Sequence, residues 1–210
     1  MEITWLGGAC FRIRGRDAAV ATDPSTAKIS KRSARPKADL VTLSDATADA
    51  DADAVRTNHG DRVPFIAAGP GEYEVCGVYV HGVSERPGGA TTLYTIDVDH
   101  VTVGHFASLS FELSDALVDE LGPIHVLLID VDADRVGTAG HAVQLINRIE
   151  PNIVVPYGRD NGANGDPDVA WLRIARDLSG AGVVGENSVS VNRSNLPEPV
   201  TVRVLEARHA

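Results

Sequence analysis

The sequence predicts an α/β domain in which two sheets are sandwiched by helices. Strand patterns dominate the first half, where short apolar segments alternate with polar residues and are separated by Gly, Asp or Pro. Helical periodicity appears only after residue 110, and there it alternates with apolar strands. No linker, repeat or low-complexity tract divides the chain, so we expect one domain over residues 1–210.

The first elements are strands. The segments ITWLG, CFRIRG and AAVATDP predict an antiparallel meander of half-buried strands, and DLVTLS predicts a short buried strand. Between AAVATDP and DLVTLS, residues 25–39 lack periodicity and are expected to form a loop. Four more strands are predicted in VPFIAAGPG, GEYEVCGVYVHGV, TTLYTIDV and HVTVGHFA. We expect turns at 70–71, at 87–89 and at 97–100.

Helices and strands alternate in the second half. SFELSDALVDELG carries apolar residues at helical spacing, and we expect Ser110 to cap this helix and Gly122 to end it. Residues 138–151 predict an amphipathic helix that ends at Pro151, and DPDVAWLRIARDLSG predicts a third helix. HVLLIDV and NIVVPYG read as buried strands, and PVTVRVLEA reads as a closing strand.

Charge and cysteine content limit the function classes. The formal net charge of −10 argues against nucleic acid and against anionic membranes, because no basic surplus exists to neutralise phosphates. The basic residues within 28–37 are interpreted as a solvated loop. Cys10 and Cys76 lie in strand-like segments, so we expect buried, unreactive thiols. The sequence shows neither a signal peptide nor a membrane-spanning run, which favours a cytoplasmic protein.

Acidic residues follow the strand DLVTLS and raise the question of a cation site. Asp45, Asp49, Asp51 and Asp53 offer hard oxygen donors, but their spacing lacks the glycine turn and bidentate Glu of a calcium loop. We therefore favour a solvated acidic loop. A second acidic group lies at 130–134, after the strand HVLLI. The pattern is equally compatible with a functional site at the strand end and with an acidic turn that caps the next helix.

Several stretches together resemble the metallo-β-lactamase fold. They are WLGGACFRIRG followed by ATDP, then DLVTLS, GPGEYEVCGVYVHGV, HVLLIDV and NIVVPYG. The chain is most similar to lactonase-like zinc hydrolases of that group, and the similarity runs through SVSVNRSNLPEPVTVRVLE, near the end of the chain. The resemblance implies an αββα four-layer sandwich with a metal site at one rim, between the two sheets.

Residue by residue, the resemblance implies a metal site whose ligands have been substituted. The histidines of the family motif Ser-His-x-His-x-Asp-His correspond to Asp45, Thr47 and Ala50, and only the aspartate, Asp49, is kept. His105 matches a family histidine that is not a ligand, which predicts a hydrogen-bonded structural role. The former metal-site positions are Gly8, Asp45, Thr47, Asp49, Ala50, Ser108, Phe111 and Gly158.

This substitution sets the functional hypotheses. A catalytic zinc needs about three N, O or S ligands, so we expect no zinc cofactor and no hydrolysis. The chain would then act as a pseudoenzyme that binds a small-molecule ligand or a protein partner, either as a single chain or as a homo-oligomer. The alternative is a re-purposed hydrolase that uses Asp45 and Asp49, with His105 as a further catalytic candidate, and a hard cation or no metal. A third reading is a zinc site rebuilt from distant histidines.

The space at the rim that imidazole rings would occupy must be filled by other groups, because protein interiors tolerate few voids. We expect Phe111, Tyr157 or Arg159 to turn into the former site. Asp45 and Asp49 should face solvent or pair with Arg159.

Overall fold

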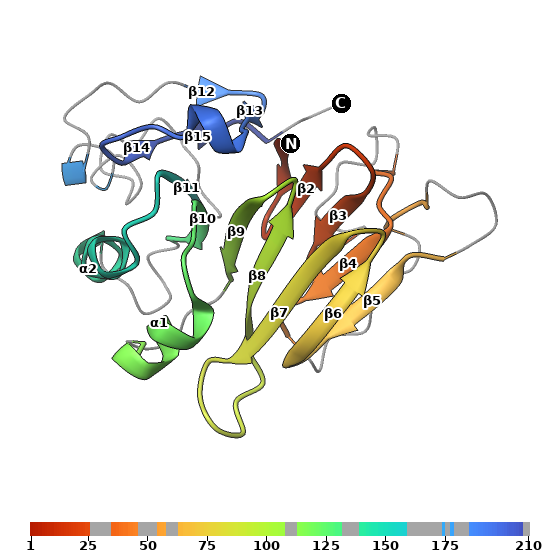
Figure 1. The fold of residues 1–210 in the computed structure, drawn as a ribbon, viewed down its shortest axis with the longest axis horizontal. Coiled ribbons are helices and arrows are strands. Elements are labelled where there is room, and N and C mark those ends of the chain that lie inside the picture. The colour runs from red at the N-terminus through yellow and green to blue at the C-terminus, as the bar shows by residue number, and fades with distance from the viewer. Residues whose placement is uncertain are drawn as a thin grey trace.

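Two mixed β-sheets pack face to face in the computed structural model of the chain (Figure 1). The structure describes residues 1–25, 35–45, 54–57, 63–107, 113–131, 139–158, 174, 177, 178 and 185–207. No helix among these residues is long and apolar enough to cross a membrane.

The six-stranded sheet contains the N-terminal meander and has the order β13-β1-β2-β3-β4-β5. Strands β1, β2 and β3 pair antiparallel as predicted, whereas β3, β4 and β5 run parallel. The parallel strands therefore end at the same edge of the sheet. The bounds are Glu2–Gly7 for β1, Cys10–Arg14 for β2, Ala19–Thr22 for β3, Leu40–Leu43 for β4, Phe65–Ala68 for β5 and Val189–Ser190 for β13.

The seven-stranded sheet has the order β14-β11-β10-β9-β8-β7-β6. Strands β6 to β9 form an antiparallel meander, and β9, β10, β11 and β14 run parallel. The bounds are Gly71–Val75 for β6, Val78–Ser84 for β7, Thr92–Val98 for β8, Val101–Phe106 for β9, Val126–Asp130 for β10, Ile153–Tyr157 for β11 and Thr201–Val202 for β14.

The single closing strand expected over PVTVRVLEA is wrong, because the chain divides at Arg203. Strand β14 lies before this residue, and β15 (Val204–Leu205) pairs after it with β12 (Gly185–Glu186). The Arg203 guanidinium donates to the Glu186 carboxylate of β12, and this contact accompanies the change of partner. A short 3₁₀ turn, η1 (Arg193–Asn195), precedes β14.

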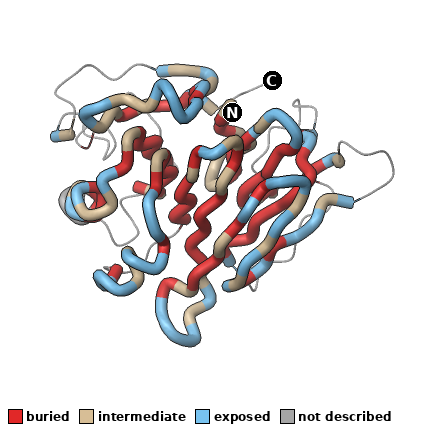
Figure 2. The backbone as a smooth tube through the Cα atoms, in the orientation of Figure 1, coloured by how far each residue is buried: buried red, intermediate tan, exposed pale blue. Residues whose placement is uncertain are grey.

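Apolar residues on three surfaces form the core. Between the sheets, Ile3 and Phe11 of one sheet meet Ile96 and Leu128 of the other in one buried cluster. Helices α1 and α2 pack on the outer face of the seven-stranded sheet (Figure 1). On the opposite outer face, the short segment 54–57 contributes buried Ala54 and Val55 against the six-stranded sheet. Figure 2 shows the buried strands at the centre of the molecule.

The helices begin where local capping permits. Helix α1 (Asp115–Leu121) is capped by Ser114, whose hydroxyl accepts from the Leu117 N–H, so the expected Ser110 cap is wrong. Gly122 ends α1 as predicted, at a φ of 68°. Helix α2 (Ala139–Ile149) matches the predicted amphipathic segment. Most of the third predicted helix lies outside the described residues, although 174, 177 and 178 are helical.

The segment GEYEVCGVYVHGV forms a hairpin, so the single strand expected there is wrong. Strands β6 and β7 pair with Val75 opposite Val78 around a two-residue turn. Cys76 and Gly77 have φ values of 51° and 77°, which is the backbone of a type I′ turn. The Cys76 thiol is exposed and not buried as expected, because a turn residue at a hairpin tip lies away from both sheets.

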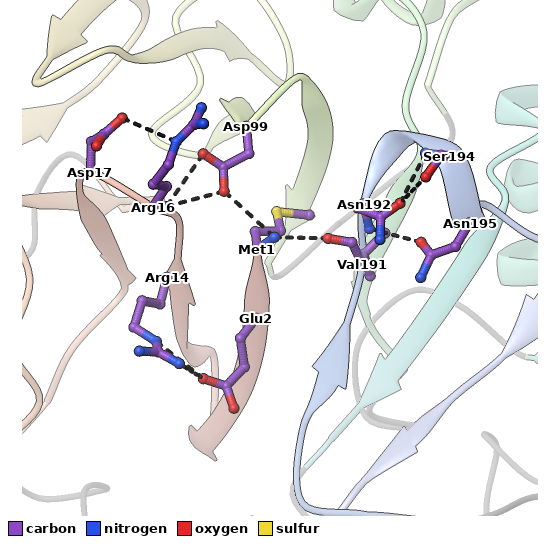
Figure 3. Close-up of polar contacts among 10 residues, drawn as sticks. All are labelled: Met1, Glu2, Arg14, Arg16, Asp17, Asp99, Val191, Asn192, Ser194 and Asn195. Atoms are coloured by element: carbon purple, nitrogen blue, oxygen red, sulfur yellow. Dashed lines mark hydrogen bonds and ion pairs between the residues drawn. The ribbon is translucent and has the colours of Figure 1, made fainter.

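Asp99 joins the two sheets at the end opposite to the rim (Figure 3). It lies in the predicted turn between β8 and β9, and both its carboxylate oxygens accept from the Arg16 N–H, at 3.1 and 3.3 Å. The same carboxylate lies 3.5 Å from the Met1 amino group, which also donates to the Val191 carbonyl at 2.8 Å. These contacts tie the β8–β9 turn to both β1 and the chain that follows β13.

Candidate functional site

The ends of the parallel strands meet at one rim of the sandwich. Asp23 and Ser44 directly follow β3 and β4 in the six-stranded sheet, and His105 and Tyr157 lie near the ends of β9 and β11 in the seven-stranded sheet. The carboxyl ends of parallel strands lie at the same edge of a sheet, which is where α/β folds collect their functional residues. The first predicted metal-site position, Gly8, belongs to the β1–β2 turn.

The β1–β2 turn is held against this rim by a threonine. The Thr22 hydroxyl donates to the Ala9 carbonyl at 2.8 Å and accepts from the Phe11 N–H at 3.0 Å. The Gly8 carbonyl accepts from the Trp5 indole N–H at 2.8 Å. These hydrogen bonds fix the β1–β2 turn. The turn carries Gly8, at the position where the resemblance implies a histidine.

Asp23 fastens the ends of β3 and β4 to each other. Its N–H donates to the Thr42 carbonyl at 2.9 Å, and its carboxylate oxygen Oδ1 accepts from the Ser44 N–H at 2.6 Å. The residue has a φ of 38°, a left-handed conformation that aspartate tolerates better than most residues. Its second oxygen, Oδ2, lies 3.8 Å from the imidazole Nδ1 of His105 in the other sheet.

The imidazole of His105 lies at the centre of this rim and is fully buried. Its Nδ1 lies 3.5 Å from the Ser44 hydroxyl, and its Nε2 lies 3.3 Å from the Tyr157 hydroxyl. Burial lowers the pKa of His105, while the carboxylates of Asp23 and Asp130 oppose the shift. Burial therefore favours the neutral imidazole, which can donate from one nitrogen and accept at the other.

Tyr157 fills the space beside His105. Its side chain is only 2% exposed and contacts the Phe11 ring edge-on at a centroid distance of 5.0 Å. It is one of the three residues expected to turn into the former site, and the other two, Phe111 and Arg159, lie outside the described residues. Its aromatic ring packs against Phe11 and His105, so this part of the rim is closely packed.

The positions assigned to metal ligands offer few donor atoms. Gly8 has a φ of 56° and Gly158 follows β11, and neither has a side chain. Asp45 is exposed after β4, where its backbone bridges to Thr91. The remaining positions, Thr47, Asp49, Ala50, Ser108 and Phe111, lie outside the described residues.

These residues do not fit a zinc ion. Among the residues that the structure describes, no group of three or more His, Cys, Asp or Glu side chains could hold a metal. The substituted positions add glycine, alanine, phenylalanine and hydroxyl side chains, which are absent or poor zinc ligands. The carboxylates of Asp45 and Asp49 do not replace a set of imidazoles.

Three other potentially reactive residues, Cys10, His125 and Asp130, lie outside this cluster. Burial raises the pKa of the Cys10 thiol, and the nearby Asp23 carboxylate raises it further, so Cys10 is a poor nucleophile. The His125 Nδ1 accepts from the Thr102 N–H at 2.9 Å, which fastens β9 to the segment before β10. Asp130 ends β10 at intermediate exposure, whereas 132–138 lie outside the described residues.

Sequence reasoning did not connect the four residues of the buried rim cluster, Asp23, Ser44, His105 and Tyr157. It predicted a hydrogen-bonded structural role for His105 and expected Tyr157 as one of three residues that could turn into the former site, and it did not single out Ser44. The usable signal was positional: each residue lies at or just beyond the end of a predicted strand.

Comparisons with known proteins agree with this fold. The family model described as "Beta-lactamase superfamily domain" matches residues 2–158. A proposed zinc-dependent hydrolase of the metallo-β-lactamase superfamily from Thermotoga maritima has a TM-score of 0.79 at 24% identity, covering 98% of both chains. A metallo hydrolase from Ignicoccus hospitalis has a TM-score of 0.60 at 16% identity, covering 98% of this chain and 95% of that one.

A proposed metal-dependent hydrolase from Parabacteroides distasonis is similar to the same degree. Its TM-score is 0.60 at 14% identity, and the match covers 96% of this chain and 91% of that one. No curated protein matches the chain. At these sequence identities the structural similarity establishes the fold alone. Any chemistry must be argued from the residues of the site.

Proposed function

Because the chain belongs to the β-lactamase superfamily, we propose that it is a member without hydrolytic zinc, which acts by binding a small-molecule ligand or a protein partner. The predicted α/β sandwich of the metallo-β-lactamase fold is confirmed, so the proposal concerns only what the rim does.

The donor set carries this proposal. Zinc activates water by lowering its pKa, and for that it needs about three protein ligands and an open position. Gly8 and Gly158 stand at two positions where the resemblance implies histidines, and glycine cannot coordinate through a side chain. Thr47, Ala50, Ser108 and Phe111 supply neither imidazole nor carboxylate, so only Asp45 and Asp49 offer charged donors.

The buried rim cluster supports the same proposal. Burial favours the neutral form of His105, and its two nitrogens lie within hydrogen-bonding distance of the Ser44 and Tyr157 hydroxyls. Tyr157 occupies space next to His105 with an aromatic side chain that also packs against Phe11. A rim held together in this way does not depend on a cation to offset buried charge.

A re-purposed hydrolase remains the rival, and Asp45 is the observation that favours it. This carboxylate is exposed and directly follows Ser44, whose hydroxyl lies near His105. A hard cation held by Asp45 and Asp49 would need oxygen ligands of the kind that aspartate supplies.

Metal content and turnover separate the two readings. The purified protein should carry well below one zinc per chain after mild dialysis, and it should not hydrolyse lactone or phosphodiester substrates with or without added Mn²⁺ or Mg²⁺. Turnover that Asp45→Ala abolishes, while Asp17→Ala at an exposed site retains it, would establish the rival. Stoichiometric zinc that survives dialysis would overturn the proposal outright.

A further inference from the structure

Strand β6 forms an open edge of the seven-stranded sheet. It is the last strand in that sheet, and within the described part of the chain no strand pairs with its other side. Figure 1 shows β6 beside β5, which is likewise the last strand of the other sheet. An open edge presents unpaired backbone groups that can accept another strand.

The register of the hairpin defines which backbone groups are open. Val75 and Val78 close the two-residue turn, so they form a hydrogen-bonded pair, and Tyr73 with Val80 forms the next. The alternating residues Glu72 and Glu74 then direct their N–H and C=O groups away from β7. An added strand would hydrogen-bond to these two residues.

The outer face of this edge is acidic. Glu72 and Glu74 are exposed, and Glu72 lies directly opposite His81. Glu74 lies directly opposite Tyr79, whose side chain is 57% exposed on the same face. Two carboxylates and an aromatic ring therefore line one side of the open backbone.

The inner side of the same edge is apolar. Tyr73 lies between Glu72 and Glu74 and points to the opposite face, where its ring lies 6.0 Å from that of Phe65 in β5. The Tyr73 hydroxyl donates to the Gly69 carbonyl at 3.1 Å, which fixes the ring. Phe65 is 48% exposed and Val63 is 82% exposed, so apolar surface continues beyond the edge.

From this alternation we propose that β6 is a docking strand for an extended segment of a protein partner, in which basic residues alternate with apolar ones. A strand added to β6 would place one set of side chains opposite Glu72 and Glu74 and the other set beside Tyr73. Opposite charges across a strand pair are favourable, and an arginine next to Tyr79 adds a cation–π contact. This inference does not depend on whether the rim hydrolyses anything.

A second copy of the chain fits this edge poorly. Antiparallel pairing of two β6 strands about a two-fold axis would bring glutamates of the two copies together, and like charges opposite each other are destabilising. The net charge of −10 adds repulsion between copies. Charged edge residues can also act only to prevent strand addition, and the experiment decides between that role and docking.

Peptides of defined sequence test the docking strand in the full-length protein. A peptide of about eight residues with alternating Arg and Val should bind, as measured by fluorescence anisotropy, whereas alternating Glu and Val should not. The variant Glu72→Lys/Glu74→Lys should bind the basic peptide about tenfold more weakly, and it should bind the acidic peptide. The matched control Asp119→Lys/Glu120→Lys makes the same charge change at exposed positions on α1 and should retain binding.

A second measurement separates strand addition from a general attraction of charges. N-methylation of alternate peptide amides removes the donors that face β6, so it should abolish binding although the charge is unchanged. Equal affinity for the methylated peptide, or equal losses in the two charge-reversal variants, would overturn the proposal. The absence of binding by the basic peptide would also overturn it and would leave Glu72 and Glu74 as edge protection.

Discussion

The ring planes of His105 and Tyr157 lie 16° apart, with Nε2 of the imidazole 3.3 Å from the phenol oxygen. The other ring nitrogen, Nδ1, faces Ser44 and Asp23 of the opposite sheet. One buried imidazole thus contacts both sheets at the rim.

Replacing Tyr157 with phenylalanine tests the contribution of the hydroxyl. Tyr157→Phe keeps the ring against Phe11 but removes the hydroxyl that lies 3.3 Å from the His105 Nε2, so the free energy of unfolding should fall by about 1–3 kcal/mol. Urea denaturation measures this change. Tyr79→Phe, at an exposed position, is the control and should leave stability within about 0.5 kcal/mol of the parent.

The stability of the fold should fall as the pH drops below about 6.5. Burial lowers the pKa of His105 in the folded state, so between that lowered pKa and the unfolded value of about 6.5 the unfolded chain binds more protons. The contribution is fully present above about pH 6.5 and is lost as the pH falls through this window. The slope for one proton is at most about 1.4 kcal/mol per pH unit.

Urea titrations at several pH values compare the parent with His105→Asn, in which the slope should decrease. His125 needs its own control, because burial and Arg193 also lower the pKa of His125. The variant His125→Gln should separately reduce the slope of the free energy of unfolding against pH. Unchanged pH dependence in His105→Asn would contradict the assignment of a buried neutral imidazole.

The turn at the tip of the β6–β7 hairpin can be improved. Cys76 and Gly77 both have positive φ, and Asn-Gly is the favoured pair in a type I′ turn. Cys76→Asn should therefore stabilise the fold by up to about 1 kcal/mol in thermal or urea unfolding. Gly77→Ala should cost about 1–2 kcal/mol through strain alone, since a Cβ at Gly77 meets nothing within 4 Å.

Restoring four histidines should not restore hydrolysis. The variant Gly8→His/Asp45→His/Thr47→His/Ala50→His returns imidazoles to one half of the former site. Ser108, Phe111 and Gly158 still leave a second metal without ligands, and a histidine at position 8 must adopt a φ near 56°. Lactonase and phosphodiesterase assays with added zinc check this prediction. Turnover in the variant, when the parent has none, would show that the rim had stayed open.

Chelators should not affect the stability of the fold. The described residues form buried clusters between the sheets and on both outer faces, and none of these clusters includes a Cys/His metal site. Folding is therefore not linked to metal binding through these residues. Thermal melts with and without EDTA should coincide, and a large loss of stability on chelation would contradict the prediction.

The alternating strands, the amphipathic helix that became α2 and the β8–β9 turn could be predicted from the sequence, because each depends on local periodicity and turn chemistry. The errors lay where local signals were ambiguous. GEYEVCGVYVHGV was predicted as one strand, yet Cys76 and Gly77 reverse it into a hairpin. Serine, a favoured capping residue type, occurs at both 110 and 114, and the position of Leu113 in the core favours the later start of α1.

The sequence alone determined which side chains occupy the former metal positions, since coordination depends on atom type and Gly8 or Gly158 cannot supply a donor. The tertiary structure decided what holds the rim instead. Asp23, Ser44, His105 and Tyr157 are far apart in sequence and meet only because parallel strands in two packed sheets end at one edge. Among the described residues, the same packing leaves one edge of β6 without a partner strand, because hydrogen bonding to another strand depends on sheet order and not on local sequence.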